Sequence, residues 1–391
     1  MVHVTGWVVM TALQRFPLAL AGVALAAVSS AALAAPPLQS LKVPAGFHVS
    51  IYSDQVPNAR EIALGTRDTV FVGSGGGNVY ALTGMKDGRA EHVHVLAKGL
   101  QMPIGVAFHD GALYVSAVSR ILKYPDIEKH LADPPKPAVV TDKLPPKTHH
   151  GGKFIAFAPD GKLYVSIGAP CNICDPGPDF AKIIRMNPDG SDWQTVATGI
   201  RNSVGFDWQP GTHTLWFTNN GRDLMGDDVP DDTLNRVSKL GENFGYPWCH
   251  AGNVLDPEFG KGHSCSEFAQ PALRLGAHVA SLGMRFYVGR MFPAAYHDAV
   301  FIAEHGSWNR SRKSGYRVVV AHVGKDGKVS RSEPFLTGFL DGQTPRGRPA
   351  DVQPMRDGSL LVSDDQNGVI YRITFMRSSM NAASHGDSSR H

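Results

Sequence analysis

Three segments of this sequence carry side chains suited to chemistry. His149 and His150 are adjacent, and a neutral imidazole can accept a proton near pH 7. Arg201 precedes Asn202, and a guanidinium is the best planar partner for a carboxylate. Residues 219–223 (NNGRD) and the acidic run after them supply oxygen atoms, the ligands that a hard divalent cation prefers. These residue types favour an anion site beside a cation, with a base close by.

A repeated strand pattern predicts how these segments are positioned. A short strand of the form apolar–aromatic–apolar–small recurs at residues 69–74, 112–117, 162–167, 214–219, 299–304 and 359–364. Turns, several of them Asp-Gly steps, precede most copies, and further strands lie before and after each copy. Six such units predict an all-β protein, a six-bladed β-propeller, whereas a Greek-key sandwich would not explain the repeat. The strand at 47–53 is expected to complete the last blade and close the ring.

Propeller geometry sorts the loops onto two faces. The turns between the first and second strands of the units are short and plain. The loops after the second strands, and those between units, are long and polar, and they contain the chemical residues above. They are expected to converge near the axis on one face, where a rigid scaffold would present a ligand site.

The sequence resembles the soluble PQQ-dependent aldose dehydrogenases, and most closely their sorbosone dehydrogenase branch. The resemblance covers about residues 40–375 and is carried by the phrases HHGGKFIAFAPDGKLYVSIG, TGIRNSVGF, NNGRDLMGDD, ENFGYPWC, EHGSWNRS and GRPADV. It implies pyrroloquinoline quinone (PQQ) over the axis, held with Ca²⁺, and oxidation of an aldose or of an aldosulose such as sorbosone. His150 matches the catalytic histidine, but His149 replaces an aspartate of the relatives, so the assignment between the two stays open.

The resemblance also implies cofactor-binding residues. Arg201 and Asn202 match a pair beside the quinone. Arg348 matches the first arginine of an R-x-R-D-V stretch, but Ala350 replaces the second, so one contact to a quinone carboxylate is lost or supplied elsewhere.

Two more positions follow from the same comparison. A family lysine after the fifth blade's central strand is absent, and His305, Arg310 or Lys313 is expected to replace it. Gln101 matches a substrate-binding glutamine with a register offset of one residue. Among aromatic residues, Trp308 and Tyr246 are candidates for a wall that stacks on the sugar.

The metal site is expected in the NNGRD loop and the acidic run. By resemblance, the carbonyl oxygens of Gly221 and Arg222 hold the Ca²⁺. Asp227 and Asp228 are candidate ligands as well, and the other acids of the run are expected to serve a structural ion or cap the loop.

The chain is expected to be exported. Residues 1–34 contain an uncharged apolar stretch that ends in an A-x-A cleavage pattern, typical of a secretory signal peptide. The mature domain is expected at 35–375, periplasmic or secreted and without stable membrane insertion, followed by a disordered polar tail at 376–391. In an oxidising compartment the four cysteines predict two disulfides, and Cys171–Cys174 with Cys249–Cys265 is the simplest of three pairings.

Composition narrows the partners and leaves two other functions open. The net charge of +3 without a basic run excludes a nucleic-acid binder. A sugar oxidase of this kind needs a small-molecule substrate and an external electron acceptor such as a quinone, a cytochrome or a dye. The alternatives are a Ca²⁺-dependent sugar lactonase, using residues such as Asn220 and Asp364, and a non-catalytic binding propeller.

Overall fold

The computed structural model describes residues 38–376. The predicted signal peptide at 1–34, and the predicted tail apart from its first residue, lie outside the described residues. Within residues 38–376, none of the helices is long and apolar enough to cross a bilayer. The helical elements there are short 3₁₀ turns: η1 (Leu38–Ser40), η2 (Ile127–Lys129), η3 (Cys265–Glu267) and η4 (Ala294–Tyr296).

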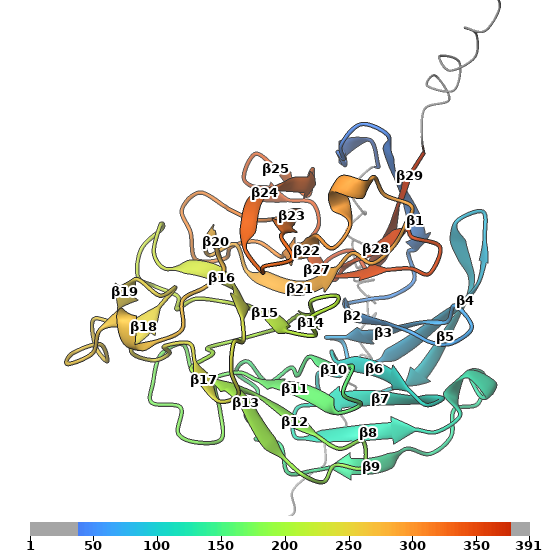
Figure 1. The fold of residues 1–391 in the computed structure, drawn as a ribbon. Helices are drawn as coiled ribbons and strands as arrows, with labels where there is room; N and C mark the ends of the chain where they lie inside the picture. Colours follow the sequence, from blue (N-terminus) through green and yellow to red (C-terminus); the bar gives the residue numbers. More distant parts are fainter. Residues whose placement is uncertain (1–37, 377–391) are drawn as a thin grey trace, which may run out of the picture. The chain divides into compact units, whose positions relative to one another are not determined.

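Six antiparallel sheets of consecutive strands confirm the predicted propeller (Figure 1). The first three blades contain β2 (Ala59–Leu64), β3 (Val70–Ser74), β4 (Val79–Lys86) and β5 (Arg89–Ala97); β6 (Val106–His109), β7 (Ala112–Ala117), β8 (Arg120–Tyr124) and β9 (Ala138–Thr141); and β10 (Ile155–Phe157), β11 (Leu163–Ile167), β12 (Lys182–Met186) and β13 (Gln194–Thr198). In the third blade, β17 (Glu242–Asn243) adds a short parallel strand beside β13.

The remaining blades follow the same order until the chain closes on itself. They contain β14 (Phe206–Trp208), β15 (Leu215–Asn219), β16 (Asp231–Arg236) and β20 (Leu273–Ala277); β21 (Ser281–Phe286), β22 (Val300–Glu304), β23 (Arg317–Val323) and β24 (Val329–Leu336); and β27 (Pro349–Pro354), β28 (Leu360–Asp364), β29 (Val369–Phe375) and β1 (Phe47–Ser53). Two hairpins lie outside the blades, β18 (Cys249–His250) with β19 (Val254–Leu255) and β25 (Leu340–Asp341) with β26 (Thr344–Pro345).

The N-terminal strand closes the ring, as predicted. β1 pairs antiparallel with β29, and Phe47 lies opposite Phe375. The Phe47 ring also packs edge-on against Phe292 and Phe335, with ring centroids 4.8 and 5.0 Å apart. This aromatic contact joins the first described strand to the core of the fifth blade, so that closure buries apolar surface as well as pairing an open edge.

The Asp-Gly steps form the predicted tight turns. Between β6 and β7, Asp110 and Gly111 both have positive φ, 47° and 75°. A two-residue hairpin turn of this type matches the twist of the strands it joins, and glycine takes the second position without steric cost.

Buried charges tie the first strands of neighbouring blades together around the axis. Glu61 accepts N–H bonds from β6 and β10, each 3.3 Å long. Asp351 accepts one from β2 at 2.9 Å, and Asp207 accepts one from β21 at 2.8 Å. The Arg285 guanidinium lies 3.5 Å from Asp351 and 3.9 Å from Glu61. Burial raises the pKa of all three carboxyl groups. These groups satisfy inner-strand N–H donors that have no ladder partner on the axial side.

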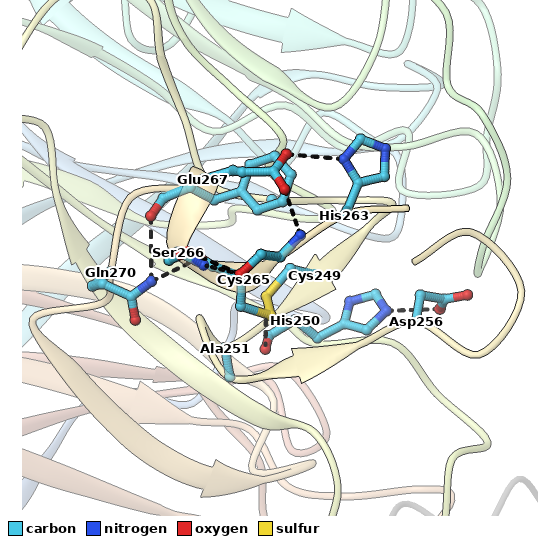
Figure 2. The surroundings of a disulfide bond; sticks show 12 residues. Cys249, His250, Ala251, Asp256, His263, Cys265, Ser266, Glu267 and Gln270 are labelled. Atoms are coloured by element: carbon cyan, nitrogen blue, oxygen red, sulfur yellow. Dashed lines mark hydrogen bonds and ion pairs between the residues drawn. A yellow bond between two sulfur atoms is a disulfide. The ribbon is translucent and has the colours of Figure 1, made fainter. Parts of the chain in front are cut away.

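Both predicted disulfides are present, Cys171–Cys174 and Cys249–Cys265. Figure 2 shows the second, which joins β18 to the start of η3. There Glu267 contacts the His263 ring at 3.1 Å, and the Gln270 amide donates to the Cys265 carbonyl at 3.0 Å. The Cys249–Cys265 disulfide therefore anchors the insertion between β17 and β20, which has little strand structure of its own.

We expect the Cys249→Ser/Cys265→Ser variant to be about 3 kcal/mol less stable than the wild type, because opening a loop of this length releases conformational entropy in the unfolded chain. Urea denaturation of both proteins measures the difference. Equal unfolding midpoints and slopes would contradict the prediction.

Candidate active site

A cavity of about 220 Å³ opens on the face where the long polar loops meet. Its lining brings together residues from the loop before β10, the loop before β14, the loop after β15, the start of β16, the segment that leads into β21 and the loop after β22. The lining residues are His150, Arg201, Asn202, Asn220, Gly221, Asp223, Asp232, His278, Ala280, Leu282, Ser307, Trp308 and Asn309. The sequence-predicted residues His150, Arg201, Asn202 and Gly221 thus lie around one cavity.

His150 is held in a single tautomer. Its Nδ1 lies 2.9 Å from the Ala169 carbonyl oxygen. A carbonyl can only accept a hydrogen bond, so Nδ1 carries the proton and Nε2 has the free lone pair. Burial, together with the neighbouring Arg201 charge, lowers the pKa of His150 to about 3. The imidazole is therefore a neutral base at the cavity wall across the physiological pH range.

His150 has a left-handed backbone conformation, and the neighbouring chain approaches it closely. Its φ is 46°, in a region that residues other than glycine adopt uncommonly. A Cβ atom at Gly168 would lie 2.5 Å from the His150 Cβ and 3.1 Å from Asn202 Oδ1. The glycine therefore permits the close approach of two cavity residues.

We expect Gly168→Ala to displace His150 and Asn202 and to lower at least ~10-fold the rate of a reaction in which His150 takes part, because small displacements of a reacting group are costly. Steady-state turnover measures the loss. The matched control is Gly161→Ala on the opposite face, where an added Cβ meets nothing within 4 Å. Its φ of 76° costs some stability, but the turnover of the folded protein should be unchanged.

His149 has a different environment from His150. It is exposed and does not line the cavity, although its ring lies edge-on to that of His150 with centroids 4.2 Å apart. Partial burial and the Arg201 charge lower the pKa of His149, while Asp223 raises it. A carboxylate, that of Asp223, therefore acts on His149, the residue that replaces the aspartate expected from the resemblance. The group that orients His150, however, is the Ala169 carbonyl.

Arg201 is almost completely buried, and two of its three guanidinium nitrogens make short hydrogen bonds. Nε donates to the Asn172 carbonyl at 2.9 Å, and Nη2 donates to Asn172 Oδ1 at 2.9 Å and to Asp223 Oδ2 at 2.7 Å. Nη1 makes only a 3.4 Å contact, to the Asn220 carbonyl. Nη1 therefore keeps hydrogen atoms for an anion in the cavity.

The NNGRD loop is anchored by its neighbours and leaves oxygen atoms unused. Asn202 N–H donates to Asn219 Oδ1 at 3.0 Å, and Gly221 N–H donates to Asp232 Oδ1 at 2.7 Å. Burial raises the pKa of Asp232 to about 6, and its other oxygen accepts the Ala280 N–H. Among the residues that the structure describes, Asn220 Oδ1 is buried with no hydrogen-bond partner. The orphaned oxygen and the adjacent backbone carbonyls are donors of the type that Ca²⁺ takes.

Asp227 and Asp228 do not line the cavity. The Arg222 side chain pairs with Asp256 outside the lining, whereas the ligand predicted from Arg222 is its backbone carbonyl oxygen, next to Gly221. Asp227 bonds Ser311, and Asp228 pairs with Arg310, on the exposed loop after β22. The acidic pair therefore joins two surface loops and does not line the cavity with Gly221, so its position gives no support to the predicted role as metal ligands. Within residues 38–376, no cluster of three His, Cys, Asp or Glu side chains forms a metal site.

Three residues predicted to bind the cofactor or the substrate also lie outside the cavity lining. Arg348 donates to the carbonyls of residues 305 and 306 at 3.1 and 2.6 Å, and its guanidinium lies 5.5 Å from the Tyr316 ring centroid. His305 is buried against Asp365 at 2.8 Å, and burial lowers its pKa to about 4. Gln101 is exposed. Two backbone carbonyls bind the Arg348 side chain, and the partly buried Asp365 carboxylate binds that of His305. The positions of these two residues therefore do not support their predicted cofactor roles.

The structure adds residues that sequence reasoning missed. Asn309 lines the cavity with both amide atoms buried and unpartnered, within the described part of the chain. His278 lines it too, bonded to the Gly226 carbonyl at 2.8 Å. Asn309 directly follows Trp308, which is 68% exposed at the cavity. Tyr246 is buried behind Arg201 and cannot stack on a sugar, which corrects that part of the predicted wall.

The sequence matches the protein family described as TrAA12-like over residues 41–376. The chain belongs to the TrAA12-like family. An uncharacterized protein of Borreliella burgdorferi is 34% identical to it over 363 residues, which are 89% of this chain and 94% of that protein. A pyrroloquinoline quinone-dependent pyranose dehydrogenase of Coprinopsis cinerea is 27% identical over 194 residues, 44% of this chain and 23% of that enzyme.

Solved structures share the fold of this TrAA12-like chain. The calcium structure of a Trichoderma reesei family AA12 carbohydrate-active enzyme has a TM-score of 0.76 at 20% identity, and the match covers 88% of this chain and 97% of that one. The holo form of the PQQ domain of the Coprinopsis cinerea pyranose dehydrogenase has a TM-score of 0.73 at 19% identity, covering 85% and 97%. The chain is thus related to sugar oxidoreductases, in agreement with the broader resemblance seen in the sequence.

Proposed function

We propose that this protein is an exported, PQQ- and Ca²⁺-dependent dehydrogenase that oxidises a sugar, either an aldose or an aldosulose such as sorbosone. The observation that carries the proposal is the His150 imidazole, neutral, fixed as the Nδ1–H tautomer, and presented to a cavity that also contains a buried arginine. PQQ, when bound, supplies the hydride acceptor. An external quinone, cytochrome or dye then removes the electrons.

The residues around the cavity fit a tricarboxylate quinone with a divalent cation. Arg201 Nη1 has donors to spare for one carboxylate. Lys153 is a further buried cation near His150, bonded to the Gly151 carbonyl at 2.7 Å, and burial lowers its pKa to about 8. For Ca²⁺ we propose the carbonyl oxygens of Gly221 and Arg222, as the resemblance implies, together with the orphaned Asn220 Oδ1.

His150 performs the proton step in this proposal. Oxidation of a C–OH group requires that the hydroxyl proton leaves as hydride leaves the carbon. His150 Nε2 accepts that proton, and the Ala169 carbonyl stabilises the resulting imidazolium through Nδ1–H. Trp308 at the opening, and the unpartnered Asn309 amide, are groups that a polyhydroxylated substrate can contact.

Reconstitution of the cofactor-free protein tests the function. The protein is mixed with PQQ and Ca²⁺, and dye reduction is followed with a panel of aldoses and with sorbosone, using Mg²⁺ in place of Ca²⁺ as the control. We expect turnover that requires both PQQ and Ca²⁺. Binding of PQQ without turnover of any sugar would contradict the proposed substrate class, and absence of PQQ binding would contradict the proposed cofactor.

We expect the acid side of the pH–rate profile to show no inflection near pH 6.5, the ordinary pKa of histidine. Burial holds the His150 pKa at about 3, so the base stays deprotonated as the pH falls from 6.5 toward 3. Between pH 6.5 and pH 3, His150 binds a proton in the unfolded chain but not in the folded chain. Lowering the pH through this window therefore decreases the stability of the folded protein. Initial rates at saturating sugar, corrected for protein that unfolds, measure the profile. An inflection at 6.5 that disappears in a His150 variant would contradict this.

The lactonase alternative requires Asn220 and Asp364 on a shared metal. Asn220 lines the cavity, but Asp364 does not. Asp364 Oδ1 accepts the Arg348 N–H at 2.9 Å, and its Oδ2 accepts the Asn367 amide at 2.7 Å. Its carboxylate is occupied by the chain itself, which favours the dehydrogenase over the lactonase. Lactone hydrolysis that depends on Ca²⁺ but not on PQQ would reverse that order.

A further inference from the structure

The CxxC segment between β11 and β12 lies outside the cavity lining, in contact with Arg201 and Asp223, which belong to that lining. The Cys171–Cys174 disulfide closes a four-residue ring, and Asn172 lies inside it. The Asn172 side chain bonds two partners at once. Its Oδ1 accepts Arg201 Nη2 at 2.9 Å and the Asp223 N–H at 2.8 Å, and its Nδ2 donates to the Asp223 carbonyl at 3.1 Å. The Asn172 carbonyl accepts from Arg201 Nε and, at 3.5 Å, from the Tyr246 hydroxyl, so that five hydrogen bonds converge on this residue.

These contacts determine how the guanidinium is oriented. Arg201 is 3% exposed, so water cannot replace a lost partner at low cost. Asn172 and Asp223 occupy Nε and Nη2, which leaves Nη1 as the nitrogen with free donors. Without the Asn172 side chain, the planar guanidinium could rotate toward Asp223 alone, and the NNGRD loop would lose its anchor at Asp223.

The disulfide ring is itself fixed from behind. Tyr246 is buried, its hydroxyl accepts the Cys174 N–H at 3.2 Å, and it lies 3.4 Å from Cys171 Sγ. The ring is thus held between the cavity wall and the loop after β17. This explains structurally why a short covalent ring is useful here, because it limits the conformations that Asn172 can adopt.

We propose that Asn172 is a positioning residue for cofactor binding. Fixed by the Cys171–Cys174 bond and by Tyr246, it orients Arg201 so that Nη1 meets a carboxylate of the cofactor, and it fixes Asp223 at the start of the acidic loop. This inference rests on the proposed function, in which Arg201 binds the anionic quinone.

The test compares Asn172→Ala with the wild type and with Asn187→Ala. Asn187 is a matched control in the same blade, since its side chain also bonds two partner residues, Lys162 and Ser191, on the opposite face. The dissociation constant of PQQ is measured by quenching of tryptophan fluorescence in the presence of Ca²⁺. We expect Asn172→Ala to weaken binding roughly 10-fold, with turnover at saturating PQQ within about twofold of the wild type, and Asn187→Ala to bind normally.

Two further measurements separate positioning from general stability. In the cofactor-free protein, amide exchange at Asp223 should accelerate in Asn172→Ala, because its N–H loses the Asn172 acceptor. The Cys171→Ser/Cys174→Ser variant should weaken PQQ binding in the same direction, whereas Cys249→Ser/Cys265→Ser should lower stability without that change. Unchanged PQQ affinity in Asn172→Ala, or an equal loss in both disulfide variants, overturns the proposal.

The outcome also distinguishes this inference from the proposed function. If the wild type binds no PQQ, the proposed function fails, and with it the role of Asn172 toward the quinone. The Asp223 exchange rate would then still decide whether Asn172 orders the cavity wall. If the wild type binds PQQ and Asn172→Ala binds it equally well, the function stands and the positioning role is wrong.

Discussion

His150→Asn is expected to lower the turnover number ~10²- to 10⁴-fold, the usual contribution of a positioned general base, while PQQ remains bound. Asparagine tolerates the left-handed backbone that His150 adopts, and its amide can still donate to the Ala169 carbonyl. It has no nitrogen lone pair at the position of Nε2. The substitution therefore removes the proton acceptor with little change in local structure. Steady-state kinetics at saturating PQQ, with PQQ affinity measured in parallel, give the result.

His149→Asn is the control, and it decides the assignment that the sequence leaves open. His149 is exposed and outside the cavity lining, so its removal should change turnover by no more than about threefold. A large loss in His149→Asn with normal turnover in His150→Asn would move the base to His149. Normal turnover in both would leave the cavity without a histidine base and would contradict the proposed proton step.

The fold could be predicted from sequence because its signals are local and repeated. The strand–turn–strand pattern specifies each blade, and Asp110-Gly111 specifies a hairpin turn. The strand that begins at Phe47 belongs to none of the six repeats, so the open edge of the last blade is where it is expected to pair. The two-residue strands β17, β18, β19, β25 and β26 were not predicted. Strands this short show no alternation, and tertiary contacts alone decide where they pair.

The site could be predicted only in part, because sequence order places the loops but not the direction of each side chain. His150, Arg201 and Asn202 lie at the cavity because the blade-to-blade loops that carry them converge there. Arg348 belongs to such a loop as well, yet two backbone carbonyls of the fifth blade capture its guanidinium. From the sequence alone, Asn172 is predicted to be a turn residue between two cysteines. Its role depends on contact with Asp223, 51 positions along the chain, which no local pattern reveals.

Arg201→Lys is expected to weaken PQQ binding roughly 10- to 100-fold, the cost of one or two charge-assisted hydrogen bonds at a buried site. Lysine keeps the charge, so Asp223 still has a cationic partner and the protein should fold. One ammonium group cannot reach the Asn172 carbonyl, Asn172 Oδ1 and Asp223 while also presenting a donor to the cavity. Titration of the cofactor-free protein with PQQ in the presence of Ca²⁺ measures the change.

The control for this substitution is Arg185→Lys, which removes a guanidinium from the same blade at the opposite face. Arg185 pairs with Asp160 at 3.0 Å and bonds Gln194, far along β12 from the cavity. Its replacement should leave PQQ affinity unchanged, because exposed ion pairs of this kind contribute little and none of its partners lines the cavity. Equal affinities of the wild type and Arg201→Lys would show that the anion is bound elsewhere, and Lys153 would then be the next cation to replace. If only Arg201→Lys loses PQQ affinity, the buried guanidinium binds the cofactor through the arrangement of its hydrogen-bond donors. Charge cannot explain such a loss, because lysine and arginine carry the same charge.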